Sequence, residues 1–216
     1  MPKVNCARKG IIFDLDGTLW DTSAQVAQAW DWLLAEREDV DLRVDRETIC
    51  GIMGKTSEEI AHSLFPSLEE GHALEIMEAL CEEELVWLKK CGGGHLYKGV
   101  ERTLSALNQS YDLFIVSNCQ EGYIETFLGC HQLERYFADW ECSGRTHKSK
   151  GENIQSVIRR NALEWAVYVG DTQGDYVAAL YAEIPFIFAA YGFGTVDVKT
   201  DRIKALDGLA ELIQAL

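Results

Sequence analysis

The sequence has no excess of basic residues, which is the feature that nucleic-acid binding requires. Its 216 residues contain 20 Lys and Arg against 35 Asp and Glu, and the formal net charge at pH 7 is −15. Binding to a polyanion depends on clustered Lys and Arg that displace counterions. We therefore expect no nucleic-acid partner. A phosphate-bearing ligand would need local positive charge or a metal ion in its site.

Long apolar runs are also absent. The sequence has no stretch of 18 apolar residues, which a membrane-spanning helix would need. Its first six residues lack the apolar core of a signal peptide. The seven cysteines form no CxxC pair, and no His lies at a zinc-finger spacing. We expect a cytoplasmic protein with free thiols and no membrane association, either a monomer or a homodimer.

Residues 10–19, with the sequence GIIFDLDGTL, are the most informative stretch. An apolar run ended by glycine predicts a buried strand, so Asp14 and Asp16 fall at its carboxyl end. Ligands bind at this end of the strands in open α/β sheets. Side chains alternate along a strand, which lets both carboxylates face one side. Two neighbouring carboxylates repel each other, and a cation is the simplest compensation.

The rest of the chain divides into a helical segment and an alternating segment. Residues 20–94 have helical periodicity without a convincing strand and end in a glycine-rich break. Strands are then predicted at 113–116, 137–142, 166–169 and 185–189, with helices between them. This alternation implies a parallel sheet with right-handed crossovers. We predict an α/β core formed by residues 1–19 and 95–216, and an inserted all-helical domain at 20–94.

One helix of the insertion has a clear apolar face. Its apolar residues recur at three- and four-residue steps: Leu74, Met77, Cys81, Leu85 and Leu88. Acidic residues crowd the rest of the helix: Glu75, Glu78, Glu82, Glu83 and Glu84. We expect all five acids to face solvent.

Polar residues follow three of the predicted strands, at one edge of the sheet. They are Asp14 with Asp16, Ser117 with Asn118, and Asp171. Lys150 opens a helix beside them, where the Ser149-to-Glu152 spacing matches a capping box. In order and spacing these residues resemble the four motifs of the haloacid dehalogenase superfamily of phosphatases: Asp14-Leu15-Asp16-Gly17-Thr18, Ser117-Asn118, Lys150 and Gly170-Asp171-Thr172-Gln173-Gly174-Asp175. The helical insertion resembles the C1 cap of subfamily I, as in phosphoglycolate phosphatases.

The resemblance implies a Rossmann-like core and an enzyme that uses Mg²⁺. It implies that Asp14 is the nucleophile, which forms an aspartyl-phosphate, and that Asp16 is the general acid and base. The implied Mg²⁺ ligands are Asp14, the backbone carbonyl of Asp16, Asp171 and Asp175, the last directly or through a water. The residues implied to bind the substrate phosphate are Gly17, Thr18, Ser117, Asn118 and Lys150.

Four residues keep alternative interpretations. Asp175 either belongs to the metal site or only caps the helix after Thr172, since Thr-x-x-Asp is a capping pattern. Gly151 stands where the family usually has proline, which leaves the direction of Lys150 open. Trp20 either lines the substrate cleft or packs in the interior. Lys55 either contacts an anionic substrate or is solvated.

Asp16 discriminates between the reactions of this family. Haloacid dehalogenases lack an acid at this position and phosphonoacetaldehyde hydrolases tend to lack it, so the resemblance implies a phosphatase. A phosphomutase of the β-phosphoglucomutase type is the alternative, although such mutases usually have Val or Ile in place of Thr18. A non-catalytic relative is the third and least favoured interpretation. The expected substrate is a small phosphorylated metabolite whose identity the sequence does not define.

Overall fold

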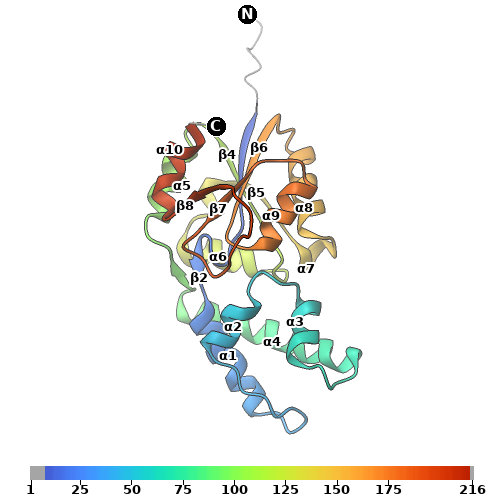
Figure 1. Cartoon of the computed structure of the whole chain (residues 1–216). Coiled ribbons are helices and arrows are strands. Elements are labelled where there is room, and N and C mark those ends of the chain that lie inside the picture. Colours follow the sequence, from blue (N-terminus) through green and yellow to red (C-terminus); the bar gives the residue numbers. More distant parts are fainter. Residues whose placement is uncertain (1–7, 215–216) are drawn as a thin grey trace, which may run out of the picture.

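The structure is a computed structural model, and it describes residues 8–214 (Figure 1). Six parallel strands form one sheet in the order β5-β4-β1-β6-β7-β8. The strands are β1 (Lys9–Phe13), β4 (Asp112–Ser117), β5 (Phe137–Cys142), β6 (Trp165–Gly170), β7 (Phe186–Ala189) and β8 (Asp201–Ile203). The strand order runs in opposite directions on the two sides of β1, so the topological switch point lies at this strand.

Helices cover both faces of the sheet (Figure 1). One face is covered by α5 (Val100–Leu107), α6 (Tyr123–His131) and α10 (Leu209–Gln214), the other by α8 (Lys150–Arg160) and α9 (Gln173–Tyr181). Shorter turns of helix are η1 (Glu134–Tyr136), α7 (Ser143–Thr146) and η2 (Leu206–Gly208). Ile11 and Phe13 pack into one core cluster and Ile12 into the other. Burial on both faces explains why β1 is a continuous apolar run, and it confirms the predicted α/β fold.

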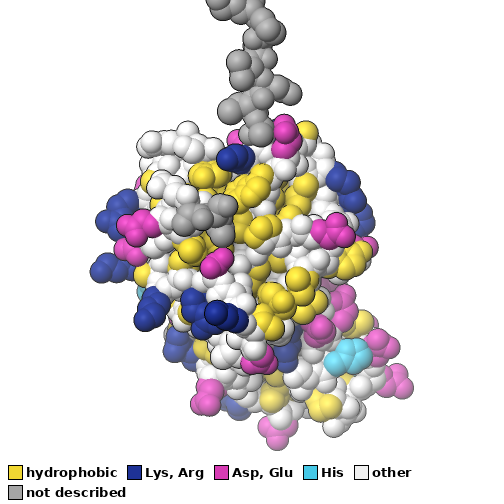
Figure 2. All heavy atoms as spheres, turned by 45° about the horizontal axis from the view of Figure 1, so that its top comes forward, with side chains coloured by type: hydrophobic (Ala, Val, Ile, Leu, Met, Phe, Trp, Pro, Cys, Tyr) yellow, Lys and Arg dark blue, Asp and Glu magenta, His cyan; other side chains and the backbone are white. Residues whose placement is uncertain are grey.

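Four consecutive helices lie beside the carboxyl ends of the strands (Figure 1). They are α1 (Ser23–Ala35), α2 (Arg46–Ile52), α3 (Ser57–Leu64) and α4 (Glu70–Cys91). These helices enclose an apolar cluster of their own, which includes Trp30, Ile49 and Met77. Figure 2, in which the top of Figure 1 is turned forward, shows apolar side chains near the middle of this face with charged side chains of both signs around them.

The connection between the sheet and these helices differs from the predicted one. The sequence predicts no strand within residues 20–94, but Trp20–Asp21 forms β2, which pairs antiparallel with β3 (His95–Leu96). Two-residue strands are too short to produce a periodicity. Gly94 approaches β2 so closely that a Cβ atom would lie 2.8 Å from the backbone oxygen of Asp21. A paired ribbon therefore joins the two parts of the chain.

Two further findings concern the described residues. Strand β8 is not predicted by the sequence, because its three residues carry the exposed side chains of Asp201 and Arg202 and show no apolar alternation. No helix within residues 8–214 is both long and apolar enough to cross a bilayer. The six cysteines in this range are free thiols, and Cys6 lies outside it.

Trp20 packs in the interior of the protein. Its ring is fully buried and meets the rings of Tyr123, Phe127 and His131 edge-on, at centroid distances of 5.4, 5.0 and 5.8 Å. Of the two interpretations of this residue, the structure supports packing. Trp20 ties the β2–β3 ribbon to α6.

We expect Trp20→Ala to lower the free energy of unfolding by about 3–5 kcal/mol, because it leaves a large cavity among aromatic rings. Trp32→Ala in α1 is the matched control, since that side chain is 50% exposed. The control should change stability by less than about 0.5 kcal/mol. Urea unfolding measures both, and similar losses for the two variants would contradict the packing role.

Candidate active site

The site forms where three neighbouring strands end. Asp14 follows β1, Ser117 is the last residue of β4, and Asp171 follows β6. Since β4 and β6 flank β1 in the parallel sheet, their carboxyl ends lie at one edge. The structure thus brings together the polar residues that the sequence places on separate strands.

Three carboxylates gather at this edge. Asp14, Asp171 and Asp175 each present one oxygen, and these oxygens all lie within 4.8 Å of one another. All three side chains are buried. Burial and repulsion by Asp175 hold the pKa of Asp14 well above its usual value and raise the pKa of Asp171 to about 7. Such a cluster needs positive charge.

Lys150 supplies one positive charge. Its Nζ donates to Oδ1 of Asp14 at 2.9 Å and to Oδ1 of Asp175 at 2.6 Å. The side chain is 6% exposed. Burial lowers the pKa of Lys150, but the attraction of Asp14 and Asp175 outweighs this and raises the pKa above its usual value. Lys150 therefore stays protonated.

The direction of Lys150 follows from how α8 begins and packs. Ser149 and Glu152 form the predicted capping box, which starts the helix at Lys150. A Cβ atom at Gly151 would lie 2.6 Å from Cδ1 of Tyr181 on α9. Glycine therefore lets α8 approach α9, the helix that carries Asp175. The absence of the family's proline does not turn Lys150 away from the site.

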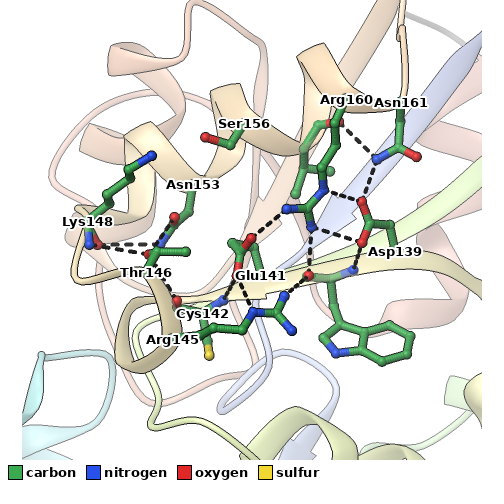
Figure 3. Close-up of polar contacts among 12 residues, drawn as sticks. Asp139, Glu141, Cys142, Arg145, Thr146, Lys148, Asn153, Ser156, Arg160 and Asn161 are labelled. Atoms are coloured by element: carbon green, nitrogen blue, oxygen red, sulfur yellow. Dashed lines mark hydrogen bonds and ion pairs between the residues drawn. The ribbon is translucent and has the colours of Figure 1, made fainter.

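A polar network fixes α8 against the edge of the sheet (Figure 3). At the end of the helix, Arg160 pairs with Glu141 of β5, whose side chain is buried. Near its start, the hydroxyl of Thr146 donates to Oδ1 of Asn153 at 2.8 Å. These contacts hold the helix at both ends and so limit the movement of Lys150.

Asp175 caps a helix and also belongs to the carboxylate cluster. Its Oδ2 accepts from the amides of Asp171 and Thr172 at 3.1 and 2.9 Å, and its own amide donates to the hydroxyl of Thr172. The capping box of α9 is therefore present. The other oxygen, Oδ1, is bound by Lys150. Capping therefore orients the carboxylate that also pairs with Lys150.

Asp171 has an oxygen that the protein leaves unused. Its Oδ2 accepts from the amides of Phe193 and Gly194 at 2.7 and 3.2 Å. Its Oδ1 is buried and has no hydrogen-bond partner within residues 8–214. Buried oxygens are nearly always satisfied, so this one points to a missing ligand. The all-oxygen donor set of the cluster fits a divalent metal ion.

Asp16 has a different environment from Asp14. Its Oδ1 accepts hydrogen bonds from the hydroxyls of Thr22 and Tyr123 at 2.8 and 2.9 Å. Burial raises the pKa of Asp16 to about 6, although both hydrogen bonds lower it. Thr22 is the N-cap residue of α1, but its hydroxyl makes no capping hydrogen bond and contacts Asp16 instead. Tyr123 lies 107 residues from Asp16 in the sequence, and no local sequence pattern predicts this contact.

In the turn after β1, the backbone amides of Gly17 and Thr18, which the sequence predicts to bind phosphate, donate to backbone carbonyls instead. The amide of Gly17 donates to the Trp20 carbonyl at 2.9 Å, and that of Thr18 to the Leu15 carbonyl at 3.2 Å. The amides of Leu15 and Asp16 donate to no acceptor in the described part of the chain. Phosphate binding by Gly17 and Thr18 stays a prediction. The amides of Leu15 and Asp16 are the ones without an acceptor among the described residues.

The side chains of Ser117 and Asn118 lie in different surroundings. Ser117 lines a cavity together with Asp14 and Asp16. The Asn118 amide nitrogen donates to the Gly54 carbonyl at 2.9 Å, and its oxygen accepts from Ser143. Asn118 therefore connects the sheet edge to the loop between α2 and α3.

The cavity lies between the sheet edge and the helical insertion, and its volume is about 60 Å³. Most of the insertion's contribution is apolar: Val26, Trp30, Ile49, Ile52, Met53, Ile60, Met77 and Cys81. Lys55 also borders the cavity, but its side chain is exposed. Glu84 is the one acidic residue that the insertion contributes to the lining of this cavity.

Glu84 does not face solvent as the sequence predicts. It is 5% exposed, and its Oε2 accepts from Nε1 of Trp30 at 2.9 Å. Burial and the charge of Asp16 raise the pKa of Glu84 to about 8. Glu84 lies one helical turn from each of Leu80 and Leu88, both fully buried. That four-residue spacing is the signal in the sequence that indicates burial.

Buried carboxylates from separate elements gather around a lysine at the carboxyl ends of the strands, which is where open α/β sheets bind their ligands. A model of the haloacid dehalogenase-like hydrolases matches residues 11–189. The chain belongs to this family. The predicted superfamily is thereby confirmed.

Curated relatives and solved structures agree with this assignment. The chain is 29% identical to a phosphoglycolate phosphatase of Photobacterium profundum over 96% of its own length and 95% of the relative's. It is 26% identical to one of Pseudomonas fluorescens, over 94% and 78%. The crystal structure of CbbY from Rhodobacter sphaeroides in complex with phosphate superposes with a TM-score of 0.76, at 19% identity, covering 93% of this chain and 95% of that one. The chain is thus phosphoglycolate phosphatase-like.

We expect Gly17→Ala to lower the free energy of unfolding by about 1–3 kcal/mol and to weaken binding of divalent metal. Its φ is +80°, and a Cβ atom there would lie 2.2 Å from Oδ2 of Asp171. Gly174→Ala is the control, because its nearest contact would be an ordinary 3.5 Å. Urea unfolding and calorimetric titration with Mg²⁺ measure the two effects. Wild-type behaviour of Gly17→Ala would contradict them.

The raised pKa of Glu84 predicts a pH-dependent stability. Between pH 4.5, the usual pKa, and about 8 the folded protein keeps a proton that the unfolded chain releases. The free energy of unfolding therefore falls as pH rises through this range. Glu84→Gln, which stays neutral, should be more stable than the wild type by about 1–3 kcal/mol at pH 8.5 and similar to it at pH 4.5.

The control for this prediction is Glu82→Gln, which removes an exposed acid from the same helix. Its difference from the wild type should not vary with pH. Thermal unfolding at several pH values compares the three proteins. A constant difference between Glu84→Gln and the wild type would show that Glu84 titrates normally.

Proposed function

We propose that this protein is a Mg²⁺-dependent phosphatase that hydrolyses a small phosphomonoester through an aspartyl-phosphate on Asp14. The observation that carries this proposal is the buried group of Asp14, Asp171 and Asp175 with Lys150. The family membership and the phosphatase relatives support the reaction class. The phosphate complex of a protein with the same fold supports the ligand.

Asp14 is the nucleophile in this proposal. Lys150 holds its Oδ1 and leaves the other oxygen for attack on phosphorus. Each pair of unit charges brought to ~3.5 Å costs about 5 kcal/mol at an effective dielectric constant near 20, so local cations are essential. Bound Mg²⁺ supplies Lewis-acid neutralisation of the phosphate charge, and its ligands are Asp14, the Asp16 carbonyl, Asp171 and Asp175.

Asp16 transfers the protons. In the first step it protonates the oxygen of the leaving group, and in the second it takes a proton from the water that hydrolyses the aspartyl-phosphate. Thr22 and Tyr123 occupy Oδ1, so Oδ2 is the oxygen that carries the proton. A pKa of about 6 keeps both forms accessible near neutral pH.

The substrate phosphate is bound by Ser117, Lys150 and free backbone amides in this proposal. The amides of Leu15 and Asp16 have no other acceptor among the described residues, whereas those of Gly17 and Thr18 stabilise the turn. Gly17 instead provides the close approach to Asp171. Asn118 acts on the helical insertion through Gly54.

Residues 20–94 act as a cap over the core of residues 1–19 and 95–216. Its helices close the cavity above Asp14 and Asp16, and the β2–β3 ribbon is the natural hinge. A closed cap excludes water during phosphoryl transfer. A cap that closes over the substrate favours a small leaving group over a phosphoprotein or a nucleic acid. The substrate is then a small phosphorylated metabolite.

We expect the pure protein to release phosphate from p-nitrophenyl phosphate, to lose this activity with EDTA and to regain it with Mg²⁺. Asp14→Asn should lower kcat by at least about 1,000-fold, because it removes the nucleophile. Acid-quenched wild-type protein should carry covalent phosphate, and the variant none. Asp41→Asn, at an exposed position, is the control and should behave as wild type.

Other outcomes identify the alternatives. Normal Mg²⁺ binding without turnover of any phosphomonoester would indicate a non-catalytic relative. Isomerised sugar phosphate without free phosphate, followed by ³¹P NMR, would indicate a phosphomutase. Covalent phosphate that persists in Asp14→Asn would assign the nucleophile to another residue.

A further inference from the structure

Two cysteines lie at the edge of the sheet that carries the site, and neither has a role in the proposed reaction. Cys119 comes directly after Ser117 and Asn118 and lines the cavity together with them. Cys142 is the last residue of β5 (Figure 3), and it is the register partner of Ser117 on the neighbouring strand β4. Both cysteines are free thiols. Their sulfurs therefore come from the ends of two adjacent strands.

Contacts between the two segments hold them against each other. The amide of Gly144 donates to the Cys119 carbonyl at 3.0 Å, and the Ser143 hydroxyl donates to Oδ1 of Asn118 at 2.9 Å. A Cβ atom at Gly144 would lie 2.5 Å from Cα of Gln120, so glycine permits this approach. Neighbouring strands are about 4.8 Å apart, and disulfides span Cα separations of about 4.4–6.8 Å. The spacing of the two segments thus suits a disulfide.

The two thiols also interact with each other. A hydrogen bond from the Cys119 thiol lowers the pKa of Cys142, and the amide and charge of Arg145 lower it further. Burial raises the pKa of Cys119 well above its usual value, although a hydrogen bond from Ser117 to the same sulfur lowers it. The thiolate is the nucleophilic form of cysteine. Cys142 is therefore the sulfur that reacts first with an oxidant, and Cys119 is the one that completes the bond.

A small oxidant has a route to this pair of cysteines. A cleft of about 600 Å³ lies beside it. The lining of the cleft includes Asn118 and Gln120, on either side of Cys119, and Ser143, directly after Cys142. The Cys142 side chain itself is 3% exposed, which favours a reagent no larger than hydrogen peroxide.

We propose that Cys119 and Cys142 form a reversible disulfide when the protein is exposed to hydrogen peroxide, and that this modification slows the enzyme. The S–S bond is about 2.05 Å long, so it draws Cys119 toward β5 and away from the Ser117 hydroxyl. Asn118 lies between these residues and moves with them, although it also holds the cap at Gly54. Formation of the disulfide is independent of the proposed function, whereas its effect on turnover rests on that function.

The bond forms in two steps that together consume one molecule of peroxide. The Cys142 thiolate attacks one oxygen, the O–O bond breaks, and the released hydroxide takes up a proton and leaves as water. The Cys119 sulfur then attacks the sulfenic sulfur of Cys142, the S–O bond breaks, and the hydroxide leaves as water with the Cys119 proton. Two electrons pass from the two sulfurs to the peroxide. A thiol reductant reverses the reaction by thiol–disulfide exchange.

Peptide mapping of the whole chain tests the disulfide without relying on activity. The protein is treated with hydrogen peroxide in the absence of reductant and is then alkylated in denaturant. We expect a linked peptide that joins Cys119 to Cys142, and alkylation of both thiols again after dithiothreitol. Hydrolysis of p-nitrophenyl phosphate by the wild type should fall at least about tenfold on oxidation, because the phosphate-binding residues are displaced, and should recover in dithiothreitol.

Two variants separate this pair of cysteines from the other thiols. Cys142→Ser cannot form the disulfide, so the same treatment should lower its hydrolysis rate by less than about twofold. Cys91→Ser is the matched control, because Cys91 is exposed and its removal leaves the pair intact. This control should lose and regain activity as the wild type does. If Cys142→Ser does not fold, the wild-type peptide map decides.

The results that would overturn the proposal are distinct from a failure of the phosphatase function. A peptide map without a link between Cys119 and Cys142 would overturn it, whatever happens to the activity. A link that forms without loss of hydrolysis would show that the modification does not affect the enzyme. If the reduced protein releases no phosphate from p-nitrophenyl phosphate, the proposed function is wrong, and the peptide map still decides whether the disulfide forms.

Discussion

Three buried carboxyl groups lie within reach of one metal ion, and one buried ammonium group bridges two of them. Taking such charges out of water costs several kcal/mol each unless they are paired. The cluster is therefore stable only where β1, β6, α8 and α9 meet, since no local segment of chain supplies all four groups. The parallel sheet serves this requirement by ending its central strands at one edge.

The backbone around the carboxylate cluster is shaped by the close approach of two glycines to Asp171. A Cβ atom at Gly192 would lie 2.4 Å from both Cβ and Oδ2 of Asp171, and Gly17 is similarly constrained. These glycines bring two loops against one carboxylate, so that amides bind one of its oxygens and the other is left open. The contacts of α8 with β5 and α7 complete the frame by holding Lys150 in place.

The cap contributes polar groups to a mostly apolar cavity. Glu84 and Trp30 pair with each other across α4 and α1, and Asn118 of the core binds the loop at Gly54. The carboxylates beside the cavity come from the strand ends, whereas most of its apolar wall comes from the helices of the insertion.

The sequence alone determined the fold class and which acids gather at the edge of the sheet, because buried strands are continuous apolar runs and the acids follow them at short spacing. The pairing of β2 with β3 and the short edge strand β8 depended on the tertiary structure, since two or three residues carry no period. The contacts of Tyr123 with Asp16 and of Trp30 with Glu84 span 107 and 54 residues. Only folding could decide them, because burial and contact with a distant element leave no local pattern. For the same reason the sequence predicts Glu84 in solvent, whereas the structure places it in the lining of the cavity beside Asp14 and Asp16.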